Sequence, residues 1–354
     1  MPKSGNPTID VRDGEELDAK LIDSYLKDHI DGLKGAAKIR QFPSGHSNLT
    51  YMIAYDNREL VLRRPPTGTK PKSGHSMVRE YSVMKALKPL YPSVPEVLLY
   101  ADESGPLGAE FYVMERVKGD LIHKEIPKNW GFDAADGRRL CEAFWDKLID
   151  LHEVDYKAAG LDDFGKPEGY VERQIKGWNA RFERAHTPDV DDFKDVRQWL
   201  GDNCPKDSGE VSVLHGDFRL DNVILDEGDH FNILAVLDWE ISALGDPLMD
   251  LGNTLAYWTE ATDPEPMRLM SMQPSMSDGM MTRAEVVEYY SAKRGIKVPN
   301  INFYMAYGTF RLTVILQQIY YRFYHGQTKN PAFSQFGPQV NLLGNHARSL
   351  ISLA

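Results

Sequence analysis

Residues 213–226, VLHGDFRLDNVILD, place five polar side chains between two short apolar runs. The apolar runs have the composition of strands in a β-hairpin. The polar residues are His215, Asp217, Arg219, Asp221 and Asn222. Such side chains are costly to bury without partners, so a hairpin has no structural need for them. Their presence indicates a loop that interrupts the hairpin and carries chemistry.

The spacing within this run indicates phosphoryl transfer. His215, Asp217 and Asn222 form the pattern His-x-Asp-x-x-x-x-Asn, and a predicted hairpin over 222–238 follows and ends in Asp238. In the phosphoryl-transfer template an aspartate meets the acceptor hydroxyl, while an asparagine and a second aspartate converge on magnesium ions. Mg²⁺ prefers oxygen ligands and few of them. The alternative is that Asp217 and Asn222 are turn residues and Asp238 is a helix cap. In that case all three residues would occupy the template positions by chance.

Composition limits the class of protein. The chain has 354 residues, 42% of them hydrophobic, which is enough for a substantial core and two lobes. A formal net charge of -11, spread along the chain, disfavours nucleic acid as a partner, because phosphate backbones need a clustered basic surface. The chain has only two cysteines, too few for a disulfide framework, and no Cys/His cluster that would suggest a structural metal. This cysteine content favours the reducing cytoplasm.

No membrane partner is expected from the hydropathy pattern. Residues 1–18 lack the apolar core of a signal peptide, and the most apolar late stretch, FYMAYGTFRLTVILQQIYY at 303–321, is interrupted by Arg311 and two glutamines. That stretch is predicted to be a buried core helix.

The apolar period changes along the chain, and this predicts an α+β, bilobal architecture. A small five-stranded antiparallel lobe with one helix is expected over 1–117, after a leading helical segment, and a larger, mainly helical catalytic and substrate lobe over 118–354. The predicted strands lie at 37–43, 49–55, 59–64, 97–101 and 109–117, and the helix of the small lobe at 75–90. The predicted later helices lie at 133–153, 168–186, 189–203, 282–294 and 302–325.

The loop between the first two strands is a candidate nucleotide-binding loop. FPSGHSNLTY, at 42–51, consists largely of small and polar residues whose backbone N–H groups could approach phosphate. The candidate cofactor-binding residues are Gly45, His46, Ser47 and Asn48. An ordinary hairpin loop accounts for the same composition, and the chain has no GxGxxG or Walker motif here.

Arg63 and Glu80 are a candidate ion pair. Glu80 falls between Met77 and Met84 on the apolar face of the helix in the small lobe, where a carboxylate needs a cation. Arg63, at the end of the third strand, could supply it and also donate toward phosphate. The alternative is that both are solvated surface charges.

These motifs resemble the aminoglycoside phosphotransferase and choline kinase group of small-molecule kinases, which share the bilobal protein-kinase-like fold. VLHGDFRLDNVILD and VLDWEISALGDPLMDLG match its catalytic and metal-loop motifs. GHSNLTY, LVLRRPP and REYSVMKAL match the first lobe of bacterial members related to kinase domains fused to acyl-CoA dehydrogenases. The resemblance covers roughly residues 30–330.

The resemblance implies ATP and Mg²⁺ as cofactors and assigns roles to individual residues. Asp217 resembles the catalytic base, Asn222 and Asp238 the magnesium ligands, and Arg63 with Glu80 the phosphate-binding ion pair. MERVKG, at 114–119, resembles the hinge, so the backbone of Glu115 and Val117 is expected to face the adenine. His215 and Asp250 resemble the residues that brace the catalytic loop.

Two features depart from related patterns. The strand residue that is usually lysine in these kinases is Arg63, so either Arg63 or Arg64 contacts phosphate. Protein kinases carry an activation loop after the metal motif, whereas here DWE runs almost directly into GDPLMDLG. A small-molecule acceptor is therefore favoured.

Several roles stay open at this stage. Glu240 could touch metal or substrate, or be a charge at a helix N-terminus. Arg219 and Asp221 could contact substrate or form a loop-bracing ion pair. The stretch 267–281 holds six methionines, which suit either an apolar substrate wall or a gap-filling core.

The sequence thus predicts an ATP- and magnesium-dependent phosphotransferase that acts on a hydroxyl of a small organic substrate. The alternative is a nucleotide-binding pseudokinase with a regulatory or scaffold role, which Asp217, Asn222 and Asp238 argue against. The methionine-rich stretch favours a hydroxyacyl compound over an aminoglycoside or a choline-like amino alcohol, because such a wall gains from burying alkyl groups.

Overall fold

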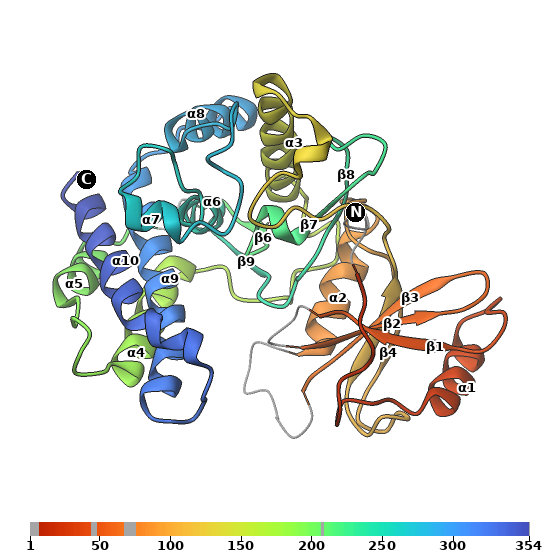
Figure 1. The fold of residues 1–354 in the computed structure, drawn as a ribbon. Coiled ribbons are helices and arrows are strands. Elements are labelled where there is room, and N and C mark those ends of the chain that lie inside the picture. Colours follow the sequence, from red (N-terminus) through yellow and green to blue (C-terminus); the bar gives the residue numbers. More distant parts are fainter. Residues whose placement is uncertain (1–6, 44–47, 67–75, 207–208, 354) are drawn as a thin grey trace. The chain divides into compact units, whose positions relative to one another are not determined.

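The computed structural model describes residues 7–43, 48–66, 76–206 and 209–353. The chain forms two compact units (Figure 1). Unit 1 comprises Met1–Leu121, Val154–Asp162 and Asn222–Ser242, and unit 2 comprises Ile122–Glu153, Asp163–Asp221 and Ala243–Ala354. The boundary between lobes that the sequence predicts near residue 117 stays a prediction.

Unit 1 contains the five-stranded antiparallel sheet that the sequence predicts, with strand order β1-β2-β3-β5-β4. Its strands are β1 (Lys38–Gln41), β2 (Leu49–Ala54), β3 (Glu59–Arg64), β4 (Val97–Ala101) and β5 (Phe111–Glu115). Two helices accompany the sheet, α1 (Ala19–His29) and α2 (Met77–Leu87). The α+β prediction for this part of the chain is confirmed.

Alternation along β3 gives the sheet two different faces. Leu60 and Leu62 pack in one hydrophobic cluster with Ile22 and Leu26 of α1. Successive strand residues point to opposite faces, so Arg63 lies on the other one. α2 lies on the side of Arg63, because its residue Glu80 bonds to that side chain. The sheet therefore places a cation beneath α2.

A second hairpin belongs to unit 1. β7 (Val223–Leu225) pairs with β8 (Ile233–Val236), which confirms the predicted hairpin over 222–238. Asp120 forms a bridge with Leu225. A Cβ atom added to Gly119 would overlap the carbonyl oxygen of Leu225, so only glycine permits this approach of the segment after β5 to the hairpin.

The prediction that the polar run interrupts a hairpin is wrong. β6 (Ser212–Leu214), which precedes the run, pairs with β9 (Ala243–Gly245), and not with β7. The polar run therefore connects strands of two different sheets. The apolar pattern predicts that both segments are strands, but it does not contain their pairing partners.

Unit 2 is mainly helical, as predicted. The predicted helices correspond to α3 (Ala134–His152), α4 (Tyr170–Ala185), α5 (Lys194–Asp202), α8 (Arg283–Arg294) and α9 (Ile301–Tyr324). Three further helices were not predicted: α6 (Pro247–Ala256), α7 (Glu265–Leu269) and α10 (Phe336–Ile351). Three short 3-10 helices are η1 (Lys128–Trp130), η2 (Leu220–Asn222) and η3 (Pro331–Gln335). α6 is buried along nearly its whole length.

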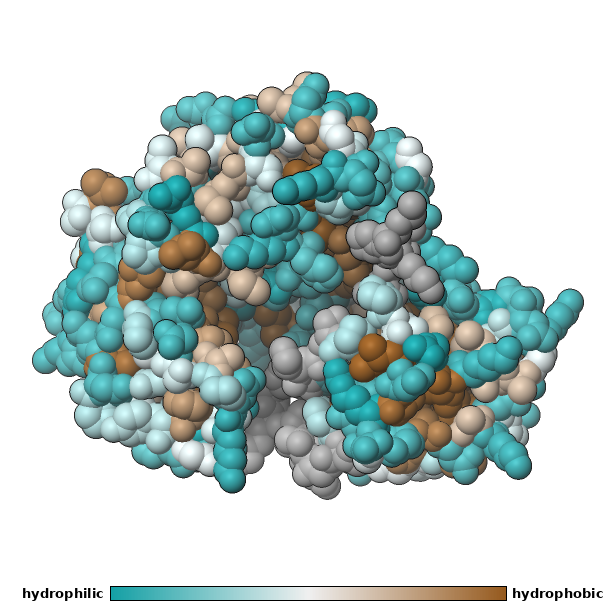
Figure 2. All heavy atoms as spheres, in the orientation of Figure 1, coloured by the Kyte–Doolittle hydropathy of each residue, from teal (hydrophilic) through white to brown (hydrophobic). Residues whose placement is uncertain are grey.

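α9 is the central helix of unit 2 and packs against α4, α6 and α10. Its buried residues confirm that the apolar stretch is a core helix, and no described helix has the length and hydropathy that a membrane crossing requires. A Cβ atom on Gly308 would overlap the carbonyl oxygen of Gly252 of α6. This close approach fixes α6 against α9. The surface in Figure 2 is mostly hydrophilic, with hydrophobic side chains in small groups.

Candidate functional site

In unit 1, Arg63 is the centre of a buried charge cluster. Its Nη1 donates to Glu80 Oε1 at 2.7 Å, and its Nη2 donates to Asp238 Oδ1 at 3.1 Å. Glu80 is 1% exposed, so its position on the apolar face of α2 is as predicted. The contact predicted between Arg63 and Glu80 is present, while their role toward phosphate stays a prediction.

Burial dominates the electrostatics of this cluster. It raises the pKa of the Glu80 carboxyl to about 7, although the Arg63 guanidinium acts in the opposite direction. Burial by itself would lower the pKa of Arg63, but Glu80 and Asp238 raise it well above its ordinary value. Arg63 is therefore a permanent cation, held by two carboxylates from different elements.

Asp238 and Asn222 lie at the open end of the β7–β8 hairpin. The backbone N–H of Leu237 donates to the carbonyl oxygen of Asn222 at 2.7 Å. Asp238 comes next and has φ 68°, a left-handed conformation that is uncommon for residues other than glycine. A backbone held in this region is often found at functional sites, where the surrounding structure fixes it. The hairpin thus brings the backbone of Asn222 next to the residue that precedes Asp238.

The sequence suggests two positions for Glu240, on a strand with Asp238 or at a helix N-terminus, and the structure shows neither. β8 ends at Val236 and α6 begins at Pro247, so Glu240 lies neither on a strand with Asp238 nor at a helix N-terminus. Its Oε2 accepts from Asn48 Nδ2 at 2.9 Å and lies 3.9 Å from Arg63. Glu240 therefore extends the charge cluster toward the predicted nucleotide-binding loop. Gly45, His46 and Ser47 of that loop lie outside the described residues.

The predicted hinge follows β5. The backbone N–H of Glu115 donates to the carbonyl oxygen of Glu96 at 2.9 Å, and its side chain accepts from Arg58 Nε at 2.8 Å. Within the part of the chain that the structure describes, the backbone N–H of Val117 donates to no other group. This amide is thus suited to an external acceptor, and its contact with adenine stays a prediction.

In unit 2, Asp250 of α6 holds the start of the polar loop. Its carboxylate accepts the backbone N–H of His215 at 2.7 Å and that of Gly216 at 2.8 Å. His152 Nε2 contacts the same carboxylate at 3.3 Å. Burial by itself would raise the pKa of Asp250, but the bonds from His152 and His215 outweigh it, so the pKa lies below its ordinary value.

Asp217 follows this braced turn. Its backbone N–H donates to His215 Nδ1 at 3.2 Å, so the histidine orients the residue after Gly216. Arg219 Nη2 donates to Asp221 Oδ2 at 2.9 Å, and its Nε lies 3.6 Å from Asp217 Oδ2. The loop-bracing ion pair considered for Arg219 and Asp221 is therefore present. Asp217 keeps partial exposure, as a base that meets a substrate requires.

Gln273 supports the same loop from the methionine-rich segment. Its Oε1 accepts the backbone N–H of Leu220 at 2.9 Å, and its Nε2 donates to the carbonyl oxygen of Tyr257 at 3.2 Å. Sequence analysis missed Gln273, His152 and Tyr257. No local signal marks them, because each acts through a contact distant in sequence.

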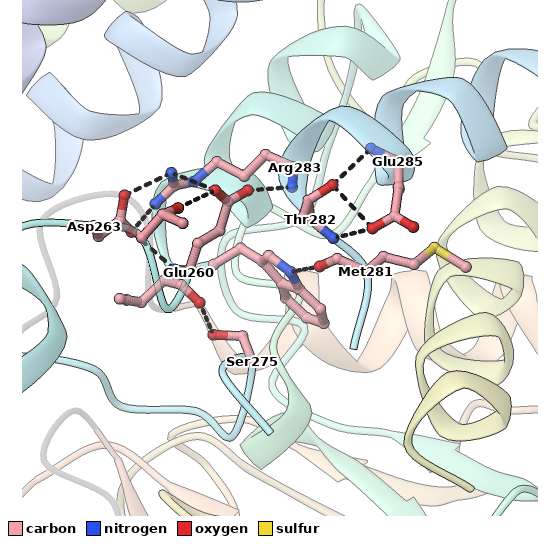
Figure 3. A network of polar contacts seen from close by, with 10 residues as sticks. Glu260, Asp263, Ser275, Met281, Thr282, Arg283 and Glu285 are labelled. Carbon is pink, nitrogen blue, oxygen red and sulfur yellow. Dashed lines mark hydrogen bonds and ion pairs between the residues drawn. The ribbon is translucent and has the colours of Figure 1, made fainter. Parts of the chain in front are cut away.

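A polar network fixes the segment that carries Gln273 (Figure 3). Trp258 Nε1 donates to the carbonyl oxygen of Met281 at 2.8 Å, and Ser275 Oγ donates to that of Thr259 at 2.8 Å. At the end of the segment, Arg283 Nη1 donates to Asp263 Oδ1 at 3.0 Å. Its methionines are mixed in exposure: Met267 and Met281 are buried, whereas Met272 is 59% exposed.

The donor set of unit 1 fits a magnesium site of the kind completed by phosphate oxygens. Among the described residues, no group of three or more His, Cys, Asp or Glu side chains is placed to hold a metal ion. Mg²⁺ in phosphoryl-transfer sites needs only one or two protein carboxylates, with water and phosphate as further ligands. The side-chain oxygens of Asp238 and Asn222 match that requirement.

The two units have the architecture of protein-kinase-like phosphotransferases. A putative aminoglycoside phosphotransferase of Ralstonia eutropha JMP134 has a TM-score of 0.82 and 28% identity, with 96% of this chain and 99% of that chain covered. The aminoglycoside phosphotransferase APH(4)-Ia, in a ternary complex with AMP-PNP and hygromycin B, has a TM-score of 0.58 and 13% identity, with 94% and 99% covered. The second likeness shows the fold alone.

Residues 38–271 match the phosphotransferase enzyme family, and the chain belongs to this family of small-molecule phosphotransferases. Acyl-CoA dehydrogenase family member 10 of Mus musculus is 35% identical over 333 residues. That alignment covers 93% of this chain and 31% of the relative, so the chain spans about a third of that relative's length. The resemblance inferred from the motifs is confirmed.

Proposed function

We propose that this chain transfers the γ-phosphoryl group of ATP, with Mg²⁺, to a hydroxyl of a small organic acceptor. One observation carries the proposal: Asp217 stands in the loop of the template motif, and Asp250 holds the turn before it through two backbone amides. A braced carboxylate with partial exposure suits a base that must meet its substrate in a fixed position.

Unit 1 would hold the nucleotide. Arg63 can donate to phosphate oxygens, and Glu80 keeps its guanidinium in place. Asp238 and Asn222 would hold the magnesium ion, which neutralises the charge on the phosphates when it is bound. The backbone amide of Val117 would donate to the adenine. Arg63 is favoured over Arg64 for the phosphate contact, because Arg63 bonds to both Glu80 and Asp238.

Asp217 would accept the proton of the acceptor hydroxyl. Arg219 Nε, 3.6 Å from the Asp217 carboxylate, would limit the rotation of that carboxylate. His215 and Asp250 act as positioning residues, because they fix the backbone around Asp217 and have no proposed contact with substrate. The pseudokinase alternative is not favoured, since Asp217, Asn222 and Asp238 all keep side chains able to perform their roles.

A hydroxyacyl compound is the favoured acceptor class. Gln273 holds the methionine-rich segment beside the polar loop, and a relative at 35% identity carries the name of an acyl-CoA dehydrogenase family member. An aminoglycoside or a choline-like amino alcohol is the alternative. The cytoplasmic location inferred from the cysteine content stays a prediction.

Two measurements on the purified chain test the proposal. AMP-PNP with Mg²⁺ should raise the melting temperature, because a ligand that binds only the native state stabilises it, and AMP-PNP with EDTA should raise it less. ³²P transfer from γ-labelled ATP should then reach hydroxylated acids or their thioesters. A chain that bound no nucleotide, or transferred phosphate to no hydroxyl compound in a broad metabolite panel, would contradict the proposal.

A further inference from the structure

Arg311 of α9 is a buried cation. Its side chain is 6% exposed, and no Asp or Glu in the described part of unit 2 forms an ion pair with it. Its guanidinium lies over the ring of Trp178, 5.3 Å from the centroid. A buried charge is costly unless it is paired, so this residue requires either strong structural compensation or an anionic ligand.

A second arginine shares the same indole ring. The Arg181 guanidinium of α4 lies 4.5 Å from the centroid of Trp178. Burial lowers the pKa of Arg181, and the positive charges of Arg184 and Arg311 lower it further. The three arginines thus repel one another, and no described carboxylate pairs with any of them. Such a cluster is suited to an anion.

Arg181 and Arg184 line a cavity of about 510 Å³ along α4 and α9, and Arg311, which is not one of its lining residues, contacts the same Trp178 ring as Arg181. Its lining includes Arg181, Arg184, Arg322, Ile315 and Ile319. Residues four apart share a helix face, so Arg311 lies on the face of α9 that carries Ile315 and Ile319 into the lining. The volume falls within the usual range for small-molecule sites, and the wall combines cations with branched alkyl groups.

The cluster also borders the catalytic loop within unit 2. Tyr257 lies beside Arg219, whose guanidinium is 5.0 Å from the ring centroid, and the charges of both Asp217 and Arg311 act on Tyr257. The charge of Asp217 acts on Arg311 as well, although the two form no ion pair. Tyr257 thus adjoins the loop of the proposed base through Arg219, and the charge of Arg311 acts on the same side chain.

We propose that Arg311, supported by Arg181, binds an anionic group of the acceptor whose hydroxyl meets Asp217. The inference rests on the proposed function and narrows the acceptor to a hydroxylated organic anion, either a carboxylate or a phosphate ester. Ile315 and Ile319 would contact an alkyl part of that molecule. A polycationic aminoglycoside would meet like charge at this cluster, so it is a poor acceptor.

The test pairs a charged probe with a neutral one. Hydroxydecanoates, with the hydroxyl at successive positions, are compared with their carboxamides in calorimetric binding and in kcat/KM with ATP and Mg²⁺. Wild type should favour the acid by at least tenfold, and Arg311→Gln should remove most of that preference. Arg181→Gln, on a half-buried residue, should reduce it. Arg139→Gln, an exposed arginine of α3, is the matched control and should leave it unchanged.

A second pair of probes identifies the anionic group. Coenzyme A thioesters of the same acids carry phosphates, whereas pantetheine thioesters do not. If wild type prefers the coenzyme A form and Arg311→Gln or Arg181→Gln loses that preference, the arginine cluster binds phosphate. If wild type prefers the free acid, the cluster binds carboxylate.

The two proposals fail differently. The anion site would be overturned if wild type bound the charged and neutral members of both pairs equally. It would also be overturned if Arg311→Gln and Arg181→Gln melted like wild type and kept the wild-type preference for the charged probe. Arginine-dependent binding of a charged probe without phosphoryl transfer would support the anion site and contradict the kinase activity.

Discussion

The Asp250 carboxylate accepts the backbone N–H of His215 at 2.7 Å, across 35 positions of the chain. Replacing Asp250 by Asn removes the charge and places amide hydrogens against the N–H donors of His215 and Gly216. We expect a loss of about 1.5 to 3 kcal/mol in the free energy of unfolding, because hydrogen bonds to charged groups have that magnitude. Urea unfolding measures it. An unchanged midpoint with unchanged slope would contradict the bracing role.

The same carboxylate predicts a dependence of stability on pH. The folded-state pKa of Asp250 lies below its ordinary value, so its contribution is present above the unfolded pKa of about 3.9 and is lost as pH falls below it. Wild type should therefore lose more stability between pH 5 and 3 than Asp250→Asn does, by an amount on the order of 1 kcal/mol. Parallel pH profiles for the two proteins would be inconsistent with an ionised Asp250.

Asp217→Asn separates turnover from nucleotide binding. Loss of general-base assistance should lower kcat by about 10² to 10⁴-fold. Affinity for AMP-PNP with Mg²⁺ should be retained, because the proposed nucleotide contacts belong to Arg63, Asn222 and Asp238. Single-turnover kinetics and calorimetry measure the two quantities. Turnover near the wild-type rate would exclude Asp217 as the base.

Asp238 offers a pair of variants that separates conformation from charge. Its φ of 68° disfavours alanine by roughly 1 to 2 kcal/mol, whereas asparagine tolerates this region. Asp238→Ala should therefore melt at a lower temperature than Asp238→Asn. Both should weaken Mg²⁺-dependent binding of AMP-PNP, because a charged ligand is lost. Wild-type affinity in Asp238→Asn would remove this residue from the metal site.

Arg63 and Glu80 should be energetically coupled. Each leaves the other as a buried, poorly solvated charge when it is replaced alone. A double-mutant cycle with Arg63→Met and Glu80→Gln, read as AMP-PNP affinity and as melting temperature, should show non-additivity of about 0.5 to 3 kcal/mol. Additive effects would mean that the pair does not act as a unit, and Arg64 would then be tested for the phosphate contact.

Gly308→Ala tests the approach of α9 to α6. The added methyl group would overlap the carbonyl oxygen of Gly252, and overpacking typically costs about 1 to 3 kcal/mol. The helix propensity of alanine recovers about 1 kcal/mol, so a net loss of stability is expected. The matched control is Gly201→Ala in α5, where nothing lies within 4 Å of the new Cβ and stability should rise. A stabilised Gly308→Ala would show that α6 can move.

The sequence by itself determined most of the helices and strands and predicted the chemistry of the polar loop. The alternation along β3 and the helical period of α2 predict that Glu80 lies on the buried face, and the spacing of His215, Asp217 and Asn222 predicts a catalytic loop. These signals are local: the period reports which face a side chain occupies, and the chemistry of phosphoryl transfer limits which residues can follow one another.

Only the tertiary structure decided which residues meet. β6 pairs with β9 across the polar loop, Gln273 supports Leu220 from 53 positions away, and Arg311 of α9 meets Arg181 of α4 at the ring of Trp178. Hydrophobic periodicity shows which face of a helix or strand is buried, but it does not show which element packs against that face. Contacts between residues far apart in sequence therefore leave no local pattern.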